Sequence, residues 1–291
     1  MTVSTAALES RRSDYPPGHR EPPSYVSAAV RVFQVSLGEM LWSRRTIFMA
    51  LVVGGPVVLA IITRVLQASG IPALRVNSVR IGSPGIFGVI MWLLFLRFIV
   101  PVLGVFYGTA LVADEVEDKT ITYLFTRPIQ RGAVLLGKYL AYLVCTTLVV
   151  LPSVMIVYFL LVPFSAVAST FGALLKDLGI LALGLAVYGG VFALIGALLK
   201  RPLIIGLIFA LGWEQVALFM PGYLKRFTVA YYIQALVPHA MPSDDTTSLL
   251  QSVLRDVPSA GTALFWLFFA LVVSLAAAAR AIERREYVLE Q

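Results

Sequence analysis

Residues 86–113 read IFGVIMWLLFLRFIVPVLGVFYGTALVA, an apolar run whose only charged side chain is Arg97. An α-helix advances about 1.5 Å per residue and needs about 20 apolar residues to cross a hydrocarbon core about 30 Å thick. Length and composition therefore predict a membrane-spanning helix here. Pro101 cannot donate a backbone hydrogen bond, so it predicts a kink within this helix.

Further apolar runs lie on both sides of this one. The other candidate spans are Thr46–Thr63, Tyr139–Val162, Leu178–Leu199, Leu203–Tyr223 and Ala263–Ala279. Hydrophobic residues make up 59% of the chain and charged residues 13%, against about 25% charged in soluble domains. The sequence thus predicts an all-α polytopic membrane protein with six transmembrane helices, and Pro56 and Pro152 predict further kinks.

The basic residues indicate how the chain is oriented. The net charge is +7, but Lys and Arg lie between the apolar runs and form no nucleic-acid patch. One set of alternate connections, which includes both termini, carries about twice as many of these cations as the other set, so both termini are predicted to be cytoplasmic. Membrane lipids are expected partners and nucleic acid is not. The single cysteine, Cys145, excludes an intrachain disulfide.

Two segments precede the first span. Residues 1–23 are rich in Pro and Arg, and we expect a disordered cytoplasmic tail, with one membrane domain over residues 24–291. Within residues 24–44, apolar side chains recur at helical spacing, at Val26, Ala29, Val30, Phe33, Leu37, Met40 and Leu41. This pattern predicts an amphipathic helix that lies in the cytoplasmic headgroup plane. The alternative is a helix packed on the protein's own cytoplasmic surface.

The connection over residues 114–138, DEVEDKTITYLFTRPIQRGAVLLGK, is too polar to span the membrane. Thr120 can cap a short helix, and Pro128 ends it. Ile121, Leu124 and Phe125 give that helix one apolar face, which needs a partner surface. In a transporter this partner would be an ATPase, and the alternative is the protein's own interfacial helix.

The pattern in this connection resembles the membrane subunits of type-2 ABC transporters. The residues that carry the resemblance are Glu115, Thr120, Leu124, Pro128, Arg131, Gly137 and Lys138. The wider likeness runs from Ser24 to the C-terminus. It includes the interfacial helix, six spans, this connection after the second span and a longer outer connection before the sixth.

The resemblance implies a permease of the inner (plasma) membrane that works in export. It would pair with a second permease copy, as a homodimer or with a close paralogue, and rest on two copies of a separate ATPase subunit that binds ATP and magnesium. The ATPase-coupling residues it implies are Glu115, Thr120, Ile121, Leu124, Phe125, Pro128 and Arg131. The chain itself is then non-catalytic and binds no cofactor.

A partial nucleotide-binding pattern does not change this view. Gly132, Gly137 and Lys138 match part of the phosphate-cradling pattern G-x-x-x-x-G-K, but Tyr139 stands where a Ser or Thr would bind magnesium. The two histidines, His19 and His239, lie outside the spans, so the sequence does not favour an intramembrane enzyme.

Arg97 and Glu214 are predicted to lie near mid-bilayer at similar depth. Charged side chains are costly there and are usually paired or functional. They could form an ion pair between the second and fifth spans, or they could line a substrate path. An alternative function also uses these two residues: a secondary transporter or channel driven by an ion gradient.

The outer connection over residues 224–262 is predicted to form a partly helical cap. It contains His239, Asp244 and Asp245. A metal site usually needs three or four convergent ligands at defined spacing, and this segment offers only loose spacing, so no metal site is expected.

Overall fold

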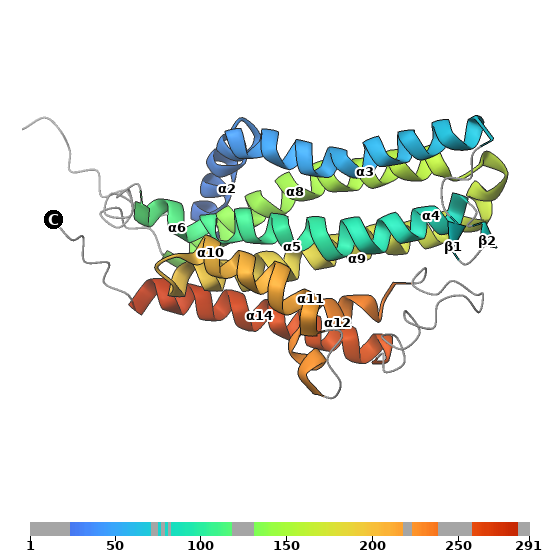
Figure 1. Cartoon of the computed structure of the whole chain (residues 1–291). Helices are drawn as coiled ribbons and strands as arrows, with labels where there is room; N and C mark the ends of the chain where they lie inside the picture. The colour runs from blue at the N-terminus through green and yellow to red at the C-terminus, as the bar shows by residue number, and fades with distance from the viewer. Residues whose placement is uncertain are drawn as a thin grey trace, which may run out of the picture.

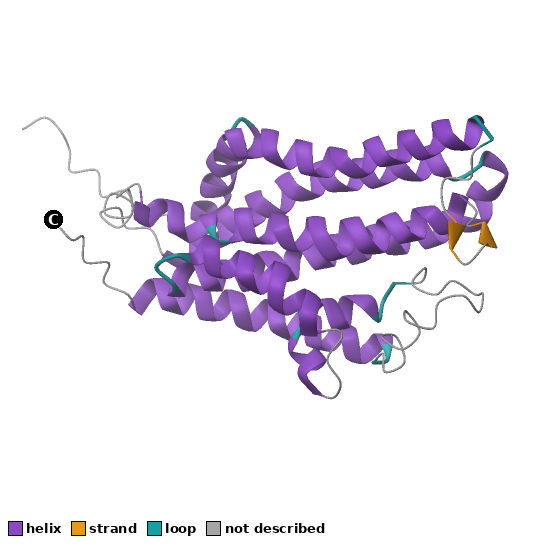
Figure 2. Ribbon diagram, viewed as in Figure 1, coloured by secondary structure: helices purple, strands orange, loops and turns teal. Residues whose placement is uncertain are grey.

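The computed structural model describes residues 24–70, 75–76, 79–80, 83–117, 131–217, 223–237 and 258–284. Long helices run side by side along one axis and form a bundle (Figure 1), and helix dominates the described chain (Figure 2). Both α2 and the last residues of α14 lie at the same end of this bundle (Figure 1).

The elements follow one another along the described chain. They are α2 (Tyr25–Leu41), α3 (Arg44–Ala68), β1 (Arg75–Val76), β2 (Val79–Arg80), α4 (Ser83–Val89), the π-helix η2 (Ile90–Ile99), α5 (Val100–Leu103), the π-helix η3 (Gly104–Gly108), α6 (Ala110–Glu117), α8 (Arg131–Leu161), α9 (Phe164–Leu198), α10 (Pro202–Leu207), the π-helix η4 (Ile208–Trp213), α11 (Glu214–Val216), the 3-10 helix η6 (Tyr223–Phe227), α12 (Val229–Gln234) and α14 (Ala260–Arg284).

Five helices are long and apolar enough to cross a membrane. They are Arg45–Ala68, Gly85–Ala113, Gly132–Leu161, Phe164–Leu198 and Ala260–Glu283. Their positions agree with five of the six predicted spans. The remaining predicted span, Leu203–Tyr223, corresponds to a shorter apolar helix over Pro202–Val216. Six spans therefore remain a prediction, whereas the five long apolar helices support a multi-pass membrane protein.

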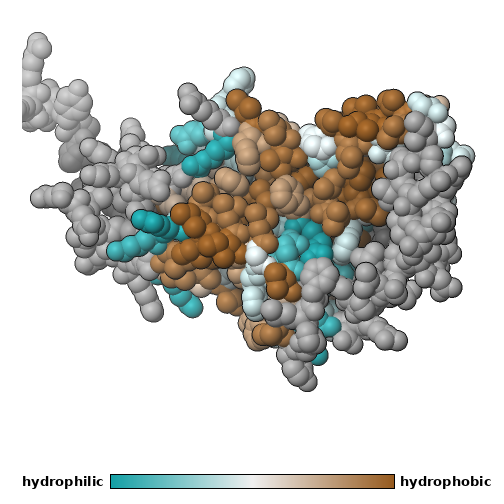
Figure 3. Space-filling view, in the orientation of Figure 1, coloured by the Kyte–Doolittle hydropathy of each residue, from teal (hydrophilic) through white to brown (hydrophobic). Residues whose placement is uncertain are grey.

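The surface of the long helices supports the membrane assignment. Ile47 and Leu51 of α3 and Phe265 and Phe268 of α14 are between 64% and 73% exposed. Apolar side chains this exposed, on several helices at once, need a lipid or protein partner. Figure 3 shows hydrophobic surface over much of the described length of the bundle.

The second span changes its helical pitch on both sides of Pro101. The π-helices η2 and η3 flank α5, which contains the proline. The backbone N–H of Val100 donates to the carbonyl of Phe95, five residues earlier, in place of the usual four. Pro101 has no N–H to donate to the preceding turn, and in that turn the side-chain amide of Gln215 donates to the carbonyl of Arg97 at 2.8 Å.

Helix α9 is longer than predicted and lies at the centre of the bundle. The helix begins at Phe164, before the predicted span Leu178–Leu199, and carries Lys176 and Asp177 inside it. Asp177 is fully buried, so a polar pair that reads as a connection in the sequence is part of a packed helix.

Glycines bring the second span into close contact with α9. A Cβ on Gly104 would lie 2.8 Å from the Cβ of Tyr188, and one on Gly108 would lie 2.8 Å from the Cβ of Phe192. Gly104 and Gly108 have the small-x-x-x-small spacing that lets membrane helices approach closely. The buried side chains of Tyr188 and Phe192 on α9 lie against these two glycines.

A small hairpin departs from the all-α expectation. Strands β1 and β2 pair antiparallel, with Arg75 opposite Arg80 and Val76 opposite Val79. They lie at the end of the bundle opposite α2 (Figure 1). Two residues per strand do not alter the helical class of the described chain.

Helix α2 packs along the start of α8. Ala28 and Ala29 of α2 and Ala133 of α8 form a small buried cluster, while Val26 and Val30 remain exposed. The predicted helix is therefore present and contacts the protein. Its place in the headgroup plane stays a prediction, since the exposed valines can still meet lipid.

Gly137→Ala tests this contact. A Cβ at position 137 would lie 2.5 Å from the carbonyl oxygen of Ala29 and 2.9 Å from the Cβ of Val32, so α2 must move away. We expect the free energy of unfolding to fall by about 1–3 kcal/mol, measured by thermal unfolding in detergent. Gly38→Ala on α2, where nothing lies within 4 Å, is the matched control. Equal stability of the two variants would contradict the packing.

Candidate functional site

Glu214 is a fully buried carboxylate at the end of the shorter apolar helix. Its Oε2 accepts a hydrogen bond from the hydroxyl of Tyr188 at 2.9 Å and another from the backbone N–H of Ala230 at 3.0 Å. Its Oε1 accepts from the N–H of Val229, also at 3.0 Å. Three donors from two other segments thus surround one carboxylate.

Two of these donors belong to the first turn of α12. The opening N–H groups of a helix have no partner within it, and an acceptor must be supplied from outside. Thr228 is the N-cap, and its hydroxyl oxygen accepts from the N–H of Tyr231 at 3.3 Å. Glu214 supplies acceptors for Val229 and Ala230, so α12 begins directly against the carboxylate.

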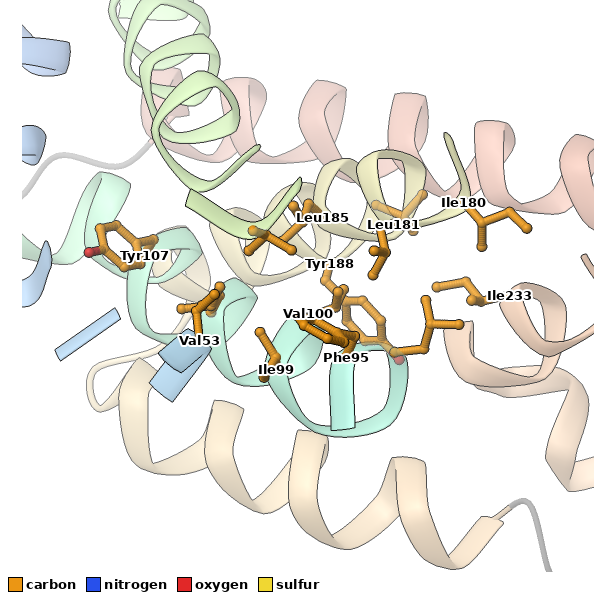
Figure 4. Packing of buried hydrophobic residues seen from close by; sticks show 14 of the residues in the cluster. Val53, Phe95, Ile99, Val100, Tyr107, Ile180, Leu181, Leu185, Tyr188 and Ile233 are labelled. Atoms are coloured by element: carbon orange, nitrogen blue, oxygen red, sulfur yellow. The ribbon is translucent and has the colours of Figure 1, made fainter. Parts of the chain in front are cut away.

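Tyr188 reaches Glu214 from the central helix α9. It is fully buried and stacks on Phe192 with a centroid separation of 6.0 Å. Figure 4 shows Tyr188 in one cluster with Phe95 and Val100 of the second span and Ile233 of α12. The apolar side chains around it exclude water from the hydrogen bond, which strengthens that bond.

Arg97 lies beside the residue that follows Glu214. Its Nη2 donates to the carbonyl oxygen of Gln215 at 3.4 Å, and the Gln215 amide returns a bond to the Arg97 carbonyl. The guanidinium carbon lies 5.2 Å from the centroid of the Trp92 ring, within the range of a cation–π contact. These contacts join the second span to the shorter apolar helix.

The geometry answers part of the expectation for Arg97 and Glu214. The two predicted residues lie in one region, because Arg97 contacts Gln215, the residue that follows Glu214. The hydrogen bonds shown for Glu214 come from Tyr188 and α12, and a direct ion pair with Arg97 stays a prediction. A place for the two residues on a substrate path also stays a prediction.

Sequence reasoning missed Tyr188 and Gln215. Tyr188 sits in an apolar run of α9, where a tyrosine commonly serves packing alone. Gln215 had a readable signal, because a proline within a span leaves a backbone carbonyl without its usual donor and an amide next to Glu214 can supply one. The donors on α12 had no signal in the sequence, since they are backbone N–H groups.

A groove opens beside this cluster. Its volume is about 460 Å³, and residues of η6 and α12 form one wall while α14 forms the other. Tyr232 and Trp266 face each other across it with ring centroids 6.4 Å apart. Arg226 is the one charged side chain among its described lining residues. Such a lining suits an apolar ligand with one anionic group.

Five of the seven predicted ATPase-coupling residues lie in the part of the chain that the structure does not describe. Thr120, Ile121, Leu124, Phe125 and Pro128 lie outside the described residues. Glu115 is in α6 and Arg131 begins α8, but their side chains are not described. What the structure does give is the position of the connection's two ends, which lie at the end of the bundle that holds α2 (Figure 1).

Two other sequence patterns can be placed. Gly132, Gly137 and Lys138 all lie within α8, so they form helix and no phosphate-cradling loop. His239, Asp244 and Asp245 lie outside the described residues. They belong to residues 238–257 of the predicted outer cap, none of which is described. Within the residues that are described, no group of three or more His, Cys, Asp or Glu could hold a metal ion.

Comparison with known proteins agrees with this architecture. No curated protein matches the chain. Residues 12–287 match the ABC-2 family of transporter proteins, a span that covers the long helices and the buried carboxylate. That match extends over nearly the whole chain, and it agrees with the resemblance carried by residues 115–138. The chain belongs to the ABC-2 family of transporters, whose members are membrane permeases.

Proposed function

We propose that this chain is the permease subunit of an ATP-driven exporter of the inner membrane and that it couples to a separate ATPase through residues 114–138. Members of the family generally work with an ATPase partner. The observation that carries the proposal is the family match over residues 12–287 together with where the connection begins and ends. The match also favours this function over transport driven by an ion gradient.

The position of the connection suits a coupling element. Helix α6 ends at Glu117 and α8 begins at Arg131, both at the end of the bundle where α2 and the last turn of α14 lie (Figure 1). Lys200 and Arg201 lie in the turn between α9 and α10, also at this end. The excess of cations in these connections supports a cytoplasmic location for this end.

In this mechanism, ATP binding closes two ATPase subunits, and residues 120–125 transmit the movement to α6 and α8. Two permease copies enclose a central cavity that alternates between the two sides of the membrane. Helix α8 is 31 residues long and packs against both α9 and α3, so a displacement at its first turn is carried along the bundle. Glu214 and Arg97 would then lie between elements that move relative to each other.

Leu124→Asp combined with Phe125→Asp tests the coupling. Two charges on the apolar face of the short helix are expected to abolish copurification of the ATPase with the tagged permease, since burying unpaired charges in an interface is unfavourable. The readout is mass spectrometry of the purified complex and its ATPase activity. The matched control is Leu124→Met with Phe125→Leu, which keeps the face apolar. An ATPase that remains bound to the double Asp variant would argue against the coupling role.

A further inference from the structure

A second cavity, of about 320 Å³, lies at the end of the bundle where α10 begins. Three cations line it: Arg45 in the first turn of α3, and Lys200 and Arg201 between α9 and α10. They come from segments far apart in the sequence. Among the described side chains that line the cavity there is no carboxylate, and those of Asp114 and Glu115, which follow the second span, are outside the description.

Apart from Thr109, whose hydroxyl donates to the carbonyl of Val105, the remaining wall of the cavity is apolar. Phe106 of the second span and Leu203 and Ile204 of α10 contribute to it. The Phe106 ring packs against Phe48 of α3, with centroids 4.8 Å apart. A cationic end and an apolar wall therefore meet in one hollow.

The apolar wall continues away from the cations along the membrane helices. Ile47 of α3 is 71% exposed, and Ile204 and Ile208 on the α10 side are 53% and 66% exposed. Figure 3 shows a hydrophilic patch at the end of the bundle where α10 begins, bordered by hydrophobic surface over α10. A ligand that fits this arrangement has an anionic head and long apolar chains.

We propose that this cavity binds the headgroup of an anionic phospholipid, with its acyl chains lying over α3 and α10. Cationic pockets between membrane helices at the cytoplasmic side are the sites that suit such headgroups, and the cytoplasmic leaflet carries anionic lipid. The predicted orientation places the cavity on that side. A free anion would use the cations and leave the apolar wall exposed. The proposal rests on the membrane assignment and on this orientation, and it does not depend on ATPase coupling.

The test uses the full chain, purified in a detergent whose micelles carry either dioleoylphosphatidylglycerol or dioleoylphosphatidylcholine. Bound lipid is counted by native mass spectrometry, and thermal stabilisation is followed in parallel. We expect the phosphatidylglycerol to bind and stabilise. Lys200→Gln with Arg201→Gln should weaken its binding by roughly 25-fold, since each cation near an anionic headgroup contributes roughly fivefold.

Two variants serve as controls. Arg31→Gln with Arg280→Gln removes two exposed cations that do not line the cavity, and it should bind the lipid as the unaltered chain does. Lys200→Arg with Arg201→Lys keeps both charges and should also bind, which separates charge from folding.

Three results would overturn the proposal. The first is an equal loss of lipid binding when Lys200 and Arg201, or Arg31 and Arg280, are changed to Gln. That result would mean that the lipid responds to the total charge of the protein and not to the cavity. The second is equal binding of phosphatidylcholine. The third is displacement of the lipid by excess inorganic phosphate, which indicates a free-anion site. No ATPase is present in the assay, so failure of the coupling proposal leaves these results unchanged.

Discussion

Gly189→Ala should lower the free energy of unfolding by about 3 kcal/mol or more, because the new Cβ would overlap the ring of Tyr142. That ring is fully buried, and its hydroxyl donates to the carbonyl of Leu185 at 2.8 Å. The ring cannot withdraw without breaking this bond and separating α8 from α9. Thermal unfolding in detergent and the yield of monodisperse protein measure the effect.

The same helix offers a control. A Cβ on Gly179, also in α9, meets nothing within 4 Å, so Gly179→Ala should leave stability unchanged or raise it by up to about 1 kcal/mol. The clash itself can be isolated with Tyr142→Leu, which removes the ring. In that background Gly189→Ala should cost less than about 1 kcal/mol, so that the two changes are strongly non-additive. Additive costs would mean that the loss arises elsewhere.

The α8–α9 contact also shows what hydrophobic runs can reveal. Both helices were predicted as spans, because their apolar runs exceed the hydrocarbon thickness. The contact between them depends on Tyr139 and Tyr142, whose hydroxyls donate to the carbonyls of Ala186 and Leu185. Tyrosines within apolar runs carry no information about which helix they will meet, so the neighbours of α8 were beyond prediction.

The ends of the spans were harder to predict than their existence. Lys176 and Asp177 interrupt the hydropathy of α9, yet the helix continues through them and Asp177 is buried in the bundle. The fifth predicted span, residues 203–223, contains Glu214 and Gln215, and the apolar helix described there covers Pro202–Val216. Hydropathy reports the solvent that a segment prefers and does not report whether a helix continues through a polar pair.

The sequence drew attention to the charged residues within the spans, but the hydrogen-bond donors around Glu214 were not foreseen. A charge near mid-bilayer predicts a polar partner, and opposite charge on another span is the simplest candidate. For Glu214 the structure supplies neutral donors, from Tyr188 and the start of α12. A carboxylate can be satisfied by N–H and O–H groups as well as by a cation, and backbone donors are invisible in a sequence.

Removal of the carboxylate in Glu214→Ala should therefore lower the free energy of unfolding by about 3–5 kcal/mol, since each buried donor left without an acceptor costs about 1–3 kcal/mol. The first turn of α12 loses two acceptors and Tyr188 loses one. Tyr188→Phe removes a single donor and should cost only about 1 kcal/mol. Thermal unfolding, with hydrogen exchange at Val229 and Ala230, separates the two variants, and equal losses would contradict the role assigned to α12.

Transport assays on isosteric variants decide whether Glu214 does more than hold α12. Glu214→Gln retains one carbonyl oxygen and the side-chain volume, so it should be less destabilised than Glu214→Ala. Arg97→Gln keeps polarity while removing the charge beside Gln215. If both variants transport normally and only their thermal stability falls, the two residues fasten the second span, α9 and α12 together. If transport fails while stability is retained, their charges lie on the substrate path.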